Sequence, residues 1–136
     1  MNKRKIYVII VSIIFIIGLF SAKTLAIDLP EVKQDKELVI FYRLSGFKGK
    51  AIRFNLNHSE GSMGQLLSGT YLYKYLEPGE HQFWSQAISQ DSITINVEVG
   101  KTYYVKGEVK MGVLAGRPQF NKISESAALA DLEKLK

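Results

Sequence analysis

Apolar and polar residues alternate strictly over the run SITINVEV, from Ser92 to Val99. A spacing of two with β-branched residues predicts a half-buried β-strand, and we expect its apolar side chains, Val99 included, to face the core. The run TYYVKGEV, which follows Gly100 and Lys101, alternates in the same way. A Gly-X pair between two such runs predicts a β-hairpin with a positive φ at Gly100.

A second hairpin is predicted around Glu77-Pro78-Gly79-Glu80. Proline presets φ for the first central turn position, and glycine tolerates the positive φ of the second. The strands of this hairpin would cover residues 70 to 76 and 81 to 88. Further apolar runs predict strands over residues 38 to 43, 51 to 56, 65 to 67 and 118 to 123.

The number and spacing of these elements predict the fold class. About seven or eight short strands separated by frequent turns are typical of a mainly β protein, either a sandwich or a barrel. Of the two, we expect an antiparallel β-sandwich of seven to eight strands. The last strand begins with Pro118, which lacks a backbone donor and therefore suits a first strand position or a sheet edge.

A short C-terminal α-helix is expected after the last strand. Ser124 can cap its N-terminus, while Glu125 in the first turn and Lys134 in the last turn match the helix dipole. Its apolar stripe consists of Ala128, Leu129, Leu132 and Leu135. We expect this stripe to lie against the sheet, because a helix this short needs packing to be stable.

Residues 1–26 have the three-part layout of a secretory signal peptide, with a basic start, a mostly apolar stretch and a short polar end. Thr24 and Ala26 are small enough for cleavage before Ile27. The alternative is an uncleaved N-terminal anchor helix, because residues 6–22 are just long enough to span a bilayer. Both readings place the rest of the chain outside the cytoplasm, either periplasmic or secreted after cleavage, or anchored in the inner membrane. Membrane contact is expected only through residues 6–22, if they are retained.

The remainder divides into two parts. Residues 27–36 are polar, contain one proline and show no periodicity, so they read as a linker. The β-sandwich domain with its C-terminal helix is expected over residues 37–136.

Charge and cysteine content exclude several classes of function. Four of the eighteen basic residues precede residue 27, and the remaining fourteen face thirteen acidic residues. The folded part is therefore close to neutral, and we expect no nucleic-acid partner. The absence of cysteine excludes disulfides, thiol catalysis and lipid attachment at an N-terminal Cys.

We found no convincing catalytic, metal-binding or cofactor-binding constellation. His58 and His81 fall in different predicted elements without metal-ligand spacing, so we expect two ordinary surface or rim histidines. No serine lies in a nucleophile-elbow motif. Glu77 and Glu80 flank a turn tip, where carboxylates are usually solvated rather than arranged as an acid/base pair.

The aromatic residues offer a candidate binding surface. Tyr71, Tyr73 and Tyr75 fall on one face of a predicted strand, and Trp84 would lie near them across the second hairpin. Exposed rings of this kind could stack on sugars or peptides. The more ordinary interpretation, which we favour, is that the tyrosine rings cover the core or its rim with their hydroxyls reaching water.

The stretch VKMGVLAGRPQF, residues 109 to 120, places Gly112 and Gly116 four residues apart. A phosphate-binding loop would need a following helix N-terminus, and a membrane dimer face would need a long apolar segment. We therefore interpret it as a close-packed corner with the apolar residues between the glycines tucked inward. Arg117 could bind an acidic partner, although a structural salt bridge or carbonyl contact is favoured.

Three motifs together resemble a known bacterial family, the domain of unknown function 2846. They are V-x-x-G-K-T-Y-Y-V at 97 to 105, L-x-P-G-x-H at 76 to 81, and M-G-x-x-x-G-R-P at 111 to 118 followed by a short helix. The resemblance covers roughly residues 37–136. It implies an exported, mostly β domain, often attached to the envelope as a lipoprotein, with no established activity. This chain departs from the lipoprotein members because it has no cysteine to acylate.

These observations predict an exported cell-envelope protein that acts as a non-enzymatic binding or assembly-support module. Its partner would be another envelope protein or a cell-wall component. The alternative is a cell-wall carbohydrate- or peptide-binding accessory, or a small enzyme, that uses the aromatic platform. A concave aromatic pocket with a buried carboxylate would favour this alternative.

Overall fold

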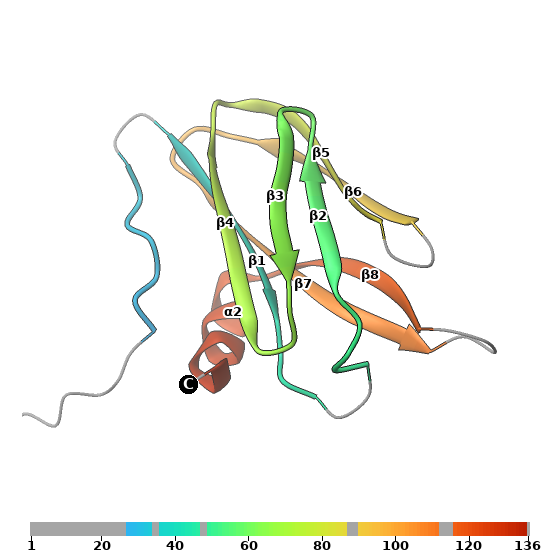
Figure 1. Ribbon diagram of the computed structural model, residues 1–136. Helices are drawn as coiled ribbons and strands as arrows, with labels where there is room; N and C mark the ends of the chain where they lie inside the picture. Colours follow the sequence, from blue (N-terminus) through green and yellow to red (C-terminus); the bar gives the residue numbers. More distant parts are fainter. Residues whose placement is uncertain (1–26, 34–35, 47–48, 87–89, 112–115, 136) are drawn as a thin grey trace, which may run out of the picture.

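The computed structural model describes residues 27–33, 36–46, 49–86, 90–111 and 116–135. Two four-stranded sheets pack face to face, and a short helix covers the outer face of one of them (Figure 1). We call the sheet with strand order β4-β1-β7-β8 the first sheet and the sheet with order β3-β2-β5-β6 the second sheet. The elements are β1 (Glu37–Arg43), β2 (Phe54–His58), β3 (Gly61–Leu66), β4 (Thr70–Leu76), β5 (Gly79–Gln86), β6 (Gln90–Val97), β7 (Thr102–Met111), β8 (Gly116–Ile123), α2 (Glu125–Leu132) and the 3-10 turn η1 (Glu133–Leu135).

This architecture confirms a mainly β protein with one short C-terminal helix. The strands of the first sheet pair antiparallel except for β1 and β7, which pair in parallel with Leu38 opposite Thr102. The predicted N-terminal helix lies outside the described residues. Among those residues, no helix has both the length and the apolar character needed to cross a bilayer.

Both hairpin predictions were wrong. β4 and β7 belong to the first sheet, whereas β5 and β6 belong to the second, so both predicted hairpins are crossovers between sheets. The turn glycines were placed correctly, because Gly79 and Gly100 have φ of 138° and 75°. Val99 is 78% exposed, since the strand ends at Val97 and the chain leaves the second sheet there. A turn signal shows that the chain reverses, but the choice of strand partner depends on distant residues.

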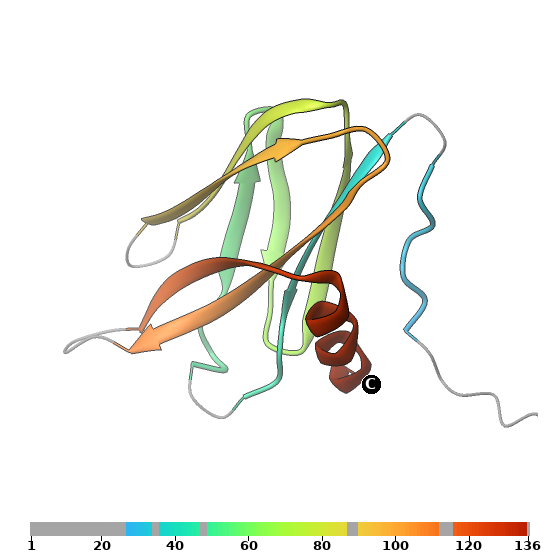
Figure 2. The same ribbon diagram turned by 180° about the vertical axis from the view of Figure 1, so that it is seen from behind.

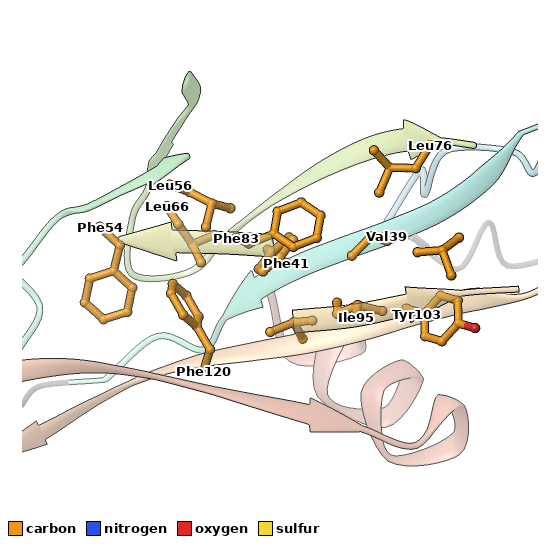
Figure 3. Close-up of a cluster of buried hydrophobic side chains, with 12 residues drawn as sticks. Val39, Phe41, Phe54, Leu56, Leu66, Leu76, Phe83, Ile95, Tyr103 and Phe120 are labelled. Carbon is orange, nitrogen blue, oxygen red and sulfur yellow. The ribbon is translucent and has the colours of Figure 1, made fainter. Parts of the chain in front are cut away.

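Aromatic and aliphatic side chains together fill the space between the sheets (Figure 3). The ring centre of Phe41 in β1 lies 4.8 Å from that of Phe83 in β5 and 5.9 Å from that of Phe120 in β8. Phe54 in β2 meets Phe120 edge to face at 6.0 Å. The first sheet supplies Phe41 and Phe120 and the second supplies Phe54 and Phe83, so neither sheet can complete this core alone.

The outer face of the first sheet forms a second apolar layer beneath the helix. All seven residues of β1 are buried, because one face meets the inter-sheet core and the other meets α2. Ala128 and Leu132 are buried against this face, as predicted. Leu129, which we expected in the same stripe, is 39% exposed. Ser124 occupies the N-cap position with extended backbone, but its side chain makes no capping hydrogen bond.

The edge strands β6 and β8 lie next to each other on one side of the molecule. The Asp91 carboxylate of β6 accepts a 2.7 Å hydrogen bond from the backbone N–H of Phe120 in β8. Pro118 lies in the same edge strand, as predicted, and the strand begins two residues earlier at Gly116. Asp91 and Pro118 thus leave this edge with fewer free backbone donors for another chain to pair with.

Candidate functional site

Three tyrosines of β4 point to the outer face of the first sheet. Tyr71, Tyr73 and Tyr75 alternate with Leu72 and Leu76, which turn inward to the core between the sheets. The tyrosines share one face, as their spacing predicted. We call Tyr71, Tyr73 and Tyr75 the tyrosine face.

Trp84 is not part of the tyrosine face. It lies in β5 of the second sheet and is half-buried, while its neighbours Phe83 and Ser85 are fully buried in the interior. Alternation therefore places the indole on the outer face of the second sheet, on the other side of the molecule. Trp84 was expected beside the tyrosines because of a hairpin that does not form.

An extended segment of the chain itself lies over the tyrosine face. We call residues 27–33 the strap; it is drawn in blue alongside β4 and β1 in Figures 1 and 2. The Tyr71 hydroxyl donates to the backbone carbonyl of Asp28 at 2.8 Å, and the Tyr75 hydroxyl donates to that of Glu31 at 2.6 Å. Since Asp28 meets Tyr71 and Glu31 meets Tyr75, the strap runs in the same direction as β4. The segment predicted as a linker thus contains no helix or strand in its described part and is docked on the sheet.

Apolar and cationic contacts add to these hydrogen bonds. Ile27 and Leu29, like Tyr71 and Tyr75, pack against the buried cluster on the outer face of the first sheet. The Lys33 ammonium lies 4.4 Å from the ring centre of Tyr75, within cation–π range. A cavity of about 350 Å³ remains where the strap begins, lined by Ile27, Gly69, Thr70, Tyr71 and Leu135.

Tyr73 is the free member of the tyrosine face. It is 47% exposed, and its ring meets Tyr75 edge to face with centres 5.7 Å apart. Its hydroxyl makes no hydrogen bond to another described residue. The face therefore has two rings that hold a peptide backbone and one that remains available to solvent.

The structure also brings the two histidines together. His58 Nε2 lies 3.0 Å from His81 Nδ1, and the rings are tilted by 33°. His58 is only 2% exposed and packs on Phe83, so the expectation of a surface or rim position was wrong for it. Its inward position continues the alternation of Phe54 and Leu56 in β2, which is the sequence signal that could have located it.

The hydrogen-bond partners define one consistent arrangement of the two neutral rings. His81 Nε2 lies 2.9 Å from the carbonyl of Glu77, which can only accept, so His81 donates there and accepts at Nδ1. His58 then donates from Nε2 to His81. His58 Nδ1 accepts from the backbone N–H of Glu60 at 3.3 Å. The pair links the turn after β2 to the crossover between β4 and β5.

Burial and a neighbouring cation favour the neutral form of His58. Burial, followed by the nearby Lys74 ammonium, lowers the pKa of His58 below its usual value. Lys74 Nζ is 2.8 Å from the Glu60 carboxylate, and its hydrogen bond lowers the pKa of Glu60. The nearer Glu60 oxygen lies 3.7 Å from His58 Nδ1.

This cluster does not have the arrangement of a serine nucleophile site. Ser59 Oγ lies 3.4 Å from His58 Nε2, but that nitrogen already carries the proton donated to His81. It therefore cannot accept the Ser59 proton as a general base. Within the described residues, no group of three or more His, Cys, Asp or Glu side chains could hold a metal ion.

A family model described as "Protein of unknown function (DUF2846)" matches residues 33–118 of the chain. The chain belongs to this family. The matched region contains β1 to β7 and the start of β8, and it ends before α2. The DUF2846 region thus includes the tyrosines, both histidines and only the last residue of the strap.

An uncharacterized protein of Haemophilus influenzae is 28% identical to this DUF2846 protein over 90 residues. The alignment covers 65% of this chain and 54% of that protein, so the chain spans about half the length of its relative. No solved structure matches the chain.

Arg43 is a buried cation that was not predicted from the sequence. It is 4% exposed and donates from its two terminal nitrogens to the carbonyls of Ile52 and Gly49. Its guanidinium also lies 4.5 Å from the ring centre of Phe54. Burial lowers the pKa of Arg43. Arg43 follows Val39 and Phe41 on the inward face of β1, so its role is to fix the loop before β2.

Arg117 and its flanking glycine behave differently from each other. The Arg117 side chain is exposed in β8 and makes no hydrogen bond or ion pair with another described residue. The favoured structural contact stays a prediction, because residues 112–115 beside it lie outside the described residues. Gly116 is tightly packed: a Cβ there would lie 2.4 Å from Ile52 Cδ1 and 2.6 Å from Val109 Cγ1. The predicted inward packing of residues 113 to 115 lies outside the described residues.

Proposed function

We propose that this DUF2846 protein is an exported β-sandwich domain of the cell envelope that acts by binding, without catalysis, to another envelope protein or cell-wall component. The proposed contact surface is the tyrosine face. The proposal is carried by one observation: the hydroxyls of Tyr71 and Tyr75 hold the main-chain carbonyls of an extended segment.

Main-chain recognition by rigid aromatic residues suits a peptide-binding surface. Hydrogen bonds to carbonyls accept many sequences, while the rings supply contact area at a low cost in conformational entropy. Because the strap occupies Tyr71 and Tyr75, the exposed ring of Tyr73 is the part of this face that a partner can contact while the strap is docked. A carbohydrate platform that combines these tyrosines with Trp84 has no support, because Trp84 belongs to the other sheet.

The proposed location rests on the sequence of residues 1–26, with their basic start and apolar stretch. After cleavage before Ile27 the domain would be free outside the cytoplasm. With residues 6–22 retained, it would be held at the inner membrane.

Site-specific photo-crosslinking tests the proposed surface. A photoreactive phenylalanine analogue replaces Tyr73 in the full chain, and Trp84 on the opposite side is replaced in the matched control. We expect irradiation of whole cells to give a defined envelope adduct from position 73 and none from position 84. Adducts of the same kind and yield from both positions would rule out the tyrosine face as the contact surface.

A further inference from the structure

The strap fixes the end of the domain from which the N-terminal segment extends. Ile27, at the start of the strap, lines a cavity with Gly69 of the turn after β3, Thr70 at the start of β4 and Leu135 at the end of η1. We call this side, formed by Ile27, residues 67–70 and Leu135, the turn end. The strap then runs along β4 toward Leu76, so Val99 and Gly100, in the crossover from β6 to β7, lie at the opposite end.

Only a short stretch of chain connects the apolar segment, residues 6–22, to the turn end. Residues 6–22 are separated from Ile27 by the four residues 23–26. Four residues in the most extended conformation reach about 14 Å. Two tyrosine hydrogen bonds hold the strap to the sheet, so it does not lengthen this tether. An embedded segment 6–22 would therefore keep the turn end close to the membrane surface.

The surface chemistry of the turn end suits an anionic membrane. Lys50 and Arg53 are exposed and make no ion pair with another described residue. Lys50 lines a surface pocket with Ser68, and Arg53 precedes Phe54, which pairs with Leu66. Leu67, in the turn between β3 and β4, is 39% exposed. Cations around an exposed apolar residue favour a surface of anionic lipid headgroups.

Exposed carboxylates gather at the opposite end. Glu77, Glu80 and Glu98 are exposed there, and Lys36 and Lys101 pair with two of them. Lys33 and Lys122 lie over the rings of Tyr75 and Tyr103, so among the described residues this end combines its cations with three exposed carboxylates and should attract lipid phosphates less than the turn end does.

We propose that, in the full chain with residues 6–22 embedded, the turn end lies against the anionic surface of the same membrane. This inference rests on the proposed envelope location and names a second partner, the lipid surface. Because the strap is held on the sheet, it sets the orientation of the domain relative to the membrane. Tyr73 and the opposite end then face away from the bilayer or sideways to it.

The absence of cysteine in the native sequence makes the test direct. Leu67→Cys and Val99→Cys, both at exposed apolar positions, each receive one environment-sensitive fluorophore, and the full chain is reconstituted into vesicles containing phosphatidylglycerol. A lipid carrying a headgroup quencher is then added. We expect quenching at position 67 to exceed that at position 99 at least threefold, and equal quenching would overturn the proposal.

Two further variants test the causes. Lys50→Glu with Arg53→Glu, or vesicles of phosphatidylcholine alone, should reduce quenching at position 67. Tyr71→Phe with Tyr75→Phe should narrow the difference between positions 67 and 99 by releasing the strap. The proposal would also be overturned if quenching at position 67 were the same in both lipid compositions and in the charge-reversed variant. The crosslinking result at Tyr73 is independent of these outcomes, so the two proposals can fail separately.

Discussion

His58 and His81 share a single hydrogen bond between ring nitrogens, with His58 as donor and His81 as acceptor when both are neutral. A proton added at His58 Nδ1 would remove the acceptor of the Glu60 backbone N–H. His58 is therefore a titratable group within the contact that links the turn after β2 to the crossover between the two sheets.

This geometry predicts a loss of stability on acidification. The folded chain lowers the pKa of His58 through burial, whereas in the unfolded chain the pKa is about 6.5. The unfolded state thus binds more protons, so this stabilisation is present above about pH 6.5 and is lost as pH falls through the folded pKa. Urea unfolding at pH 7.5 and 5.0 should show the decrease.

His58→Gln is the matched variant, because an amide can donate to His81 without titrating in this range. We expect the pH dependence between 7.5 and 5.0 to become shallower in this variant. An unchanged pH dependence of the unfolding free energy in His58→Gln would contradict the prediction, because it would show that other titratable groups cause the loss of stability. Heteronuclear NMR at pH 8 should independently find both rings with the proton on Nε2.

Removal of the tyrosine hydroxyls should loosen the strap. Tyr71→Phe and Tyr75→Phe each remove one hydrogen bond to a main-chain carbonyl, worth about 1 kcal/mol. We expect faster tryptic cleavage after Lys33 in both variants. Tyr73→Phe is the control, since its hydroxyl bonds no described residue. A cleavage rate in the double variant equal to that of Tyr73→Phe would count against docking of the strap.

Gly116→Ala should destabilise the domain by overpacking. The added methyl would collide with Ile52 Cδ1 and Val109 Cγ1, and such strain typically costs about 1 to 3 kcal/mol. Ile52→Val removes the nearer of the two atoms, so the double variant should recover part of the loss. Denaturant unfolding of the four proteins gives the coupling energy, and strict additivity would refute the predicted collision.

Arg43 should tolerate neither truncation nor a change to lysine. Arg43→Ala leaves two carbonyls without their donor and removes the contact with Phe54, for a loss of about 2 to 3 kcal/mol. Arg43→Lys replaces the planar guanidinium, which reaches both carbonyls, with a single ammonium group. It should therefore recover less than half of the lost free energy of unfolding. Chemical unfolding measures both, and full recovery by lysine would show that charge alone matters.

Arg117→Ala should leave the free energy of unfolding within about 0.5 kcal/mol of the parent value, because the side chain is exposed without a described partner. A larger loss in thermal or chemical unfolding would reveal a structural contact. This variant is therefore suited to binding experiments in which stability must stay constant.

The sequence located most of the strands because alternation and turn residues are local signals, but β3 was predicted only at its end, over residues 65 to 67. The run from Ser92 to Val97 and the tyrosine spacing in β4 both appear in the structure as predicted. Pairing between strands was not predictable in the same way. Reversals at Gly79 and Gly100 lead to the other sheet, and only contacts with residues far along the chain decide this.

The candidate site, too, was predictable from the sequence only where local signals decide its geometry. The shared face of Tyr71 and Tyr75 follows from periodicity, but their bonds to Asp28 and Glu31 depend on how a segment without periodicity returns across the sheet. The contact between His58 and His81 depends on the pairing of β2 with β5. Arg43 and His58 were missed because polar residues at inward positions are rare.

The parallel pairing of β1 with β7 has a consequence for the order of folding. Leu38 and its partner Thr102 are separated by most of the domain, and the strands of the two sheets are interleaved along the chain. A fold dominated by such distant contacts closes slowly, typically over milliseconds to seconds. β1 can pair with β4 earlier, but its other edge stays open until β7 is synthesised. If the chain is exported as proposed, a chain that left the cytoplasm before that moment would cross the membrane with this edge of β1 unpaired and complete its fold on the far side.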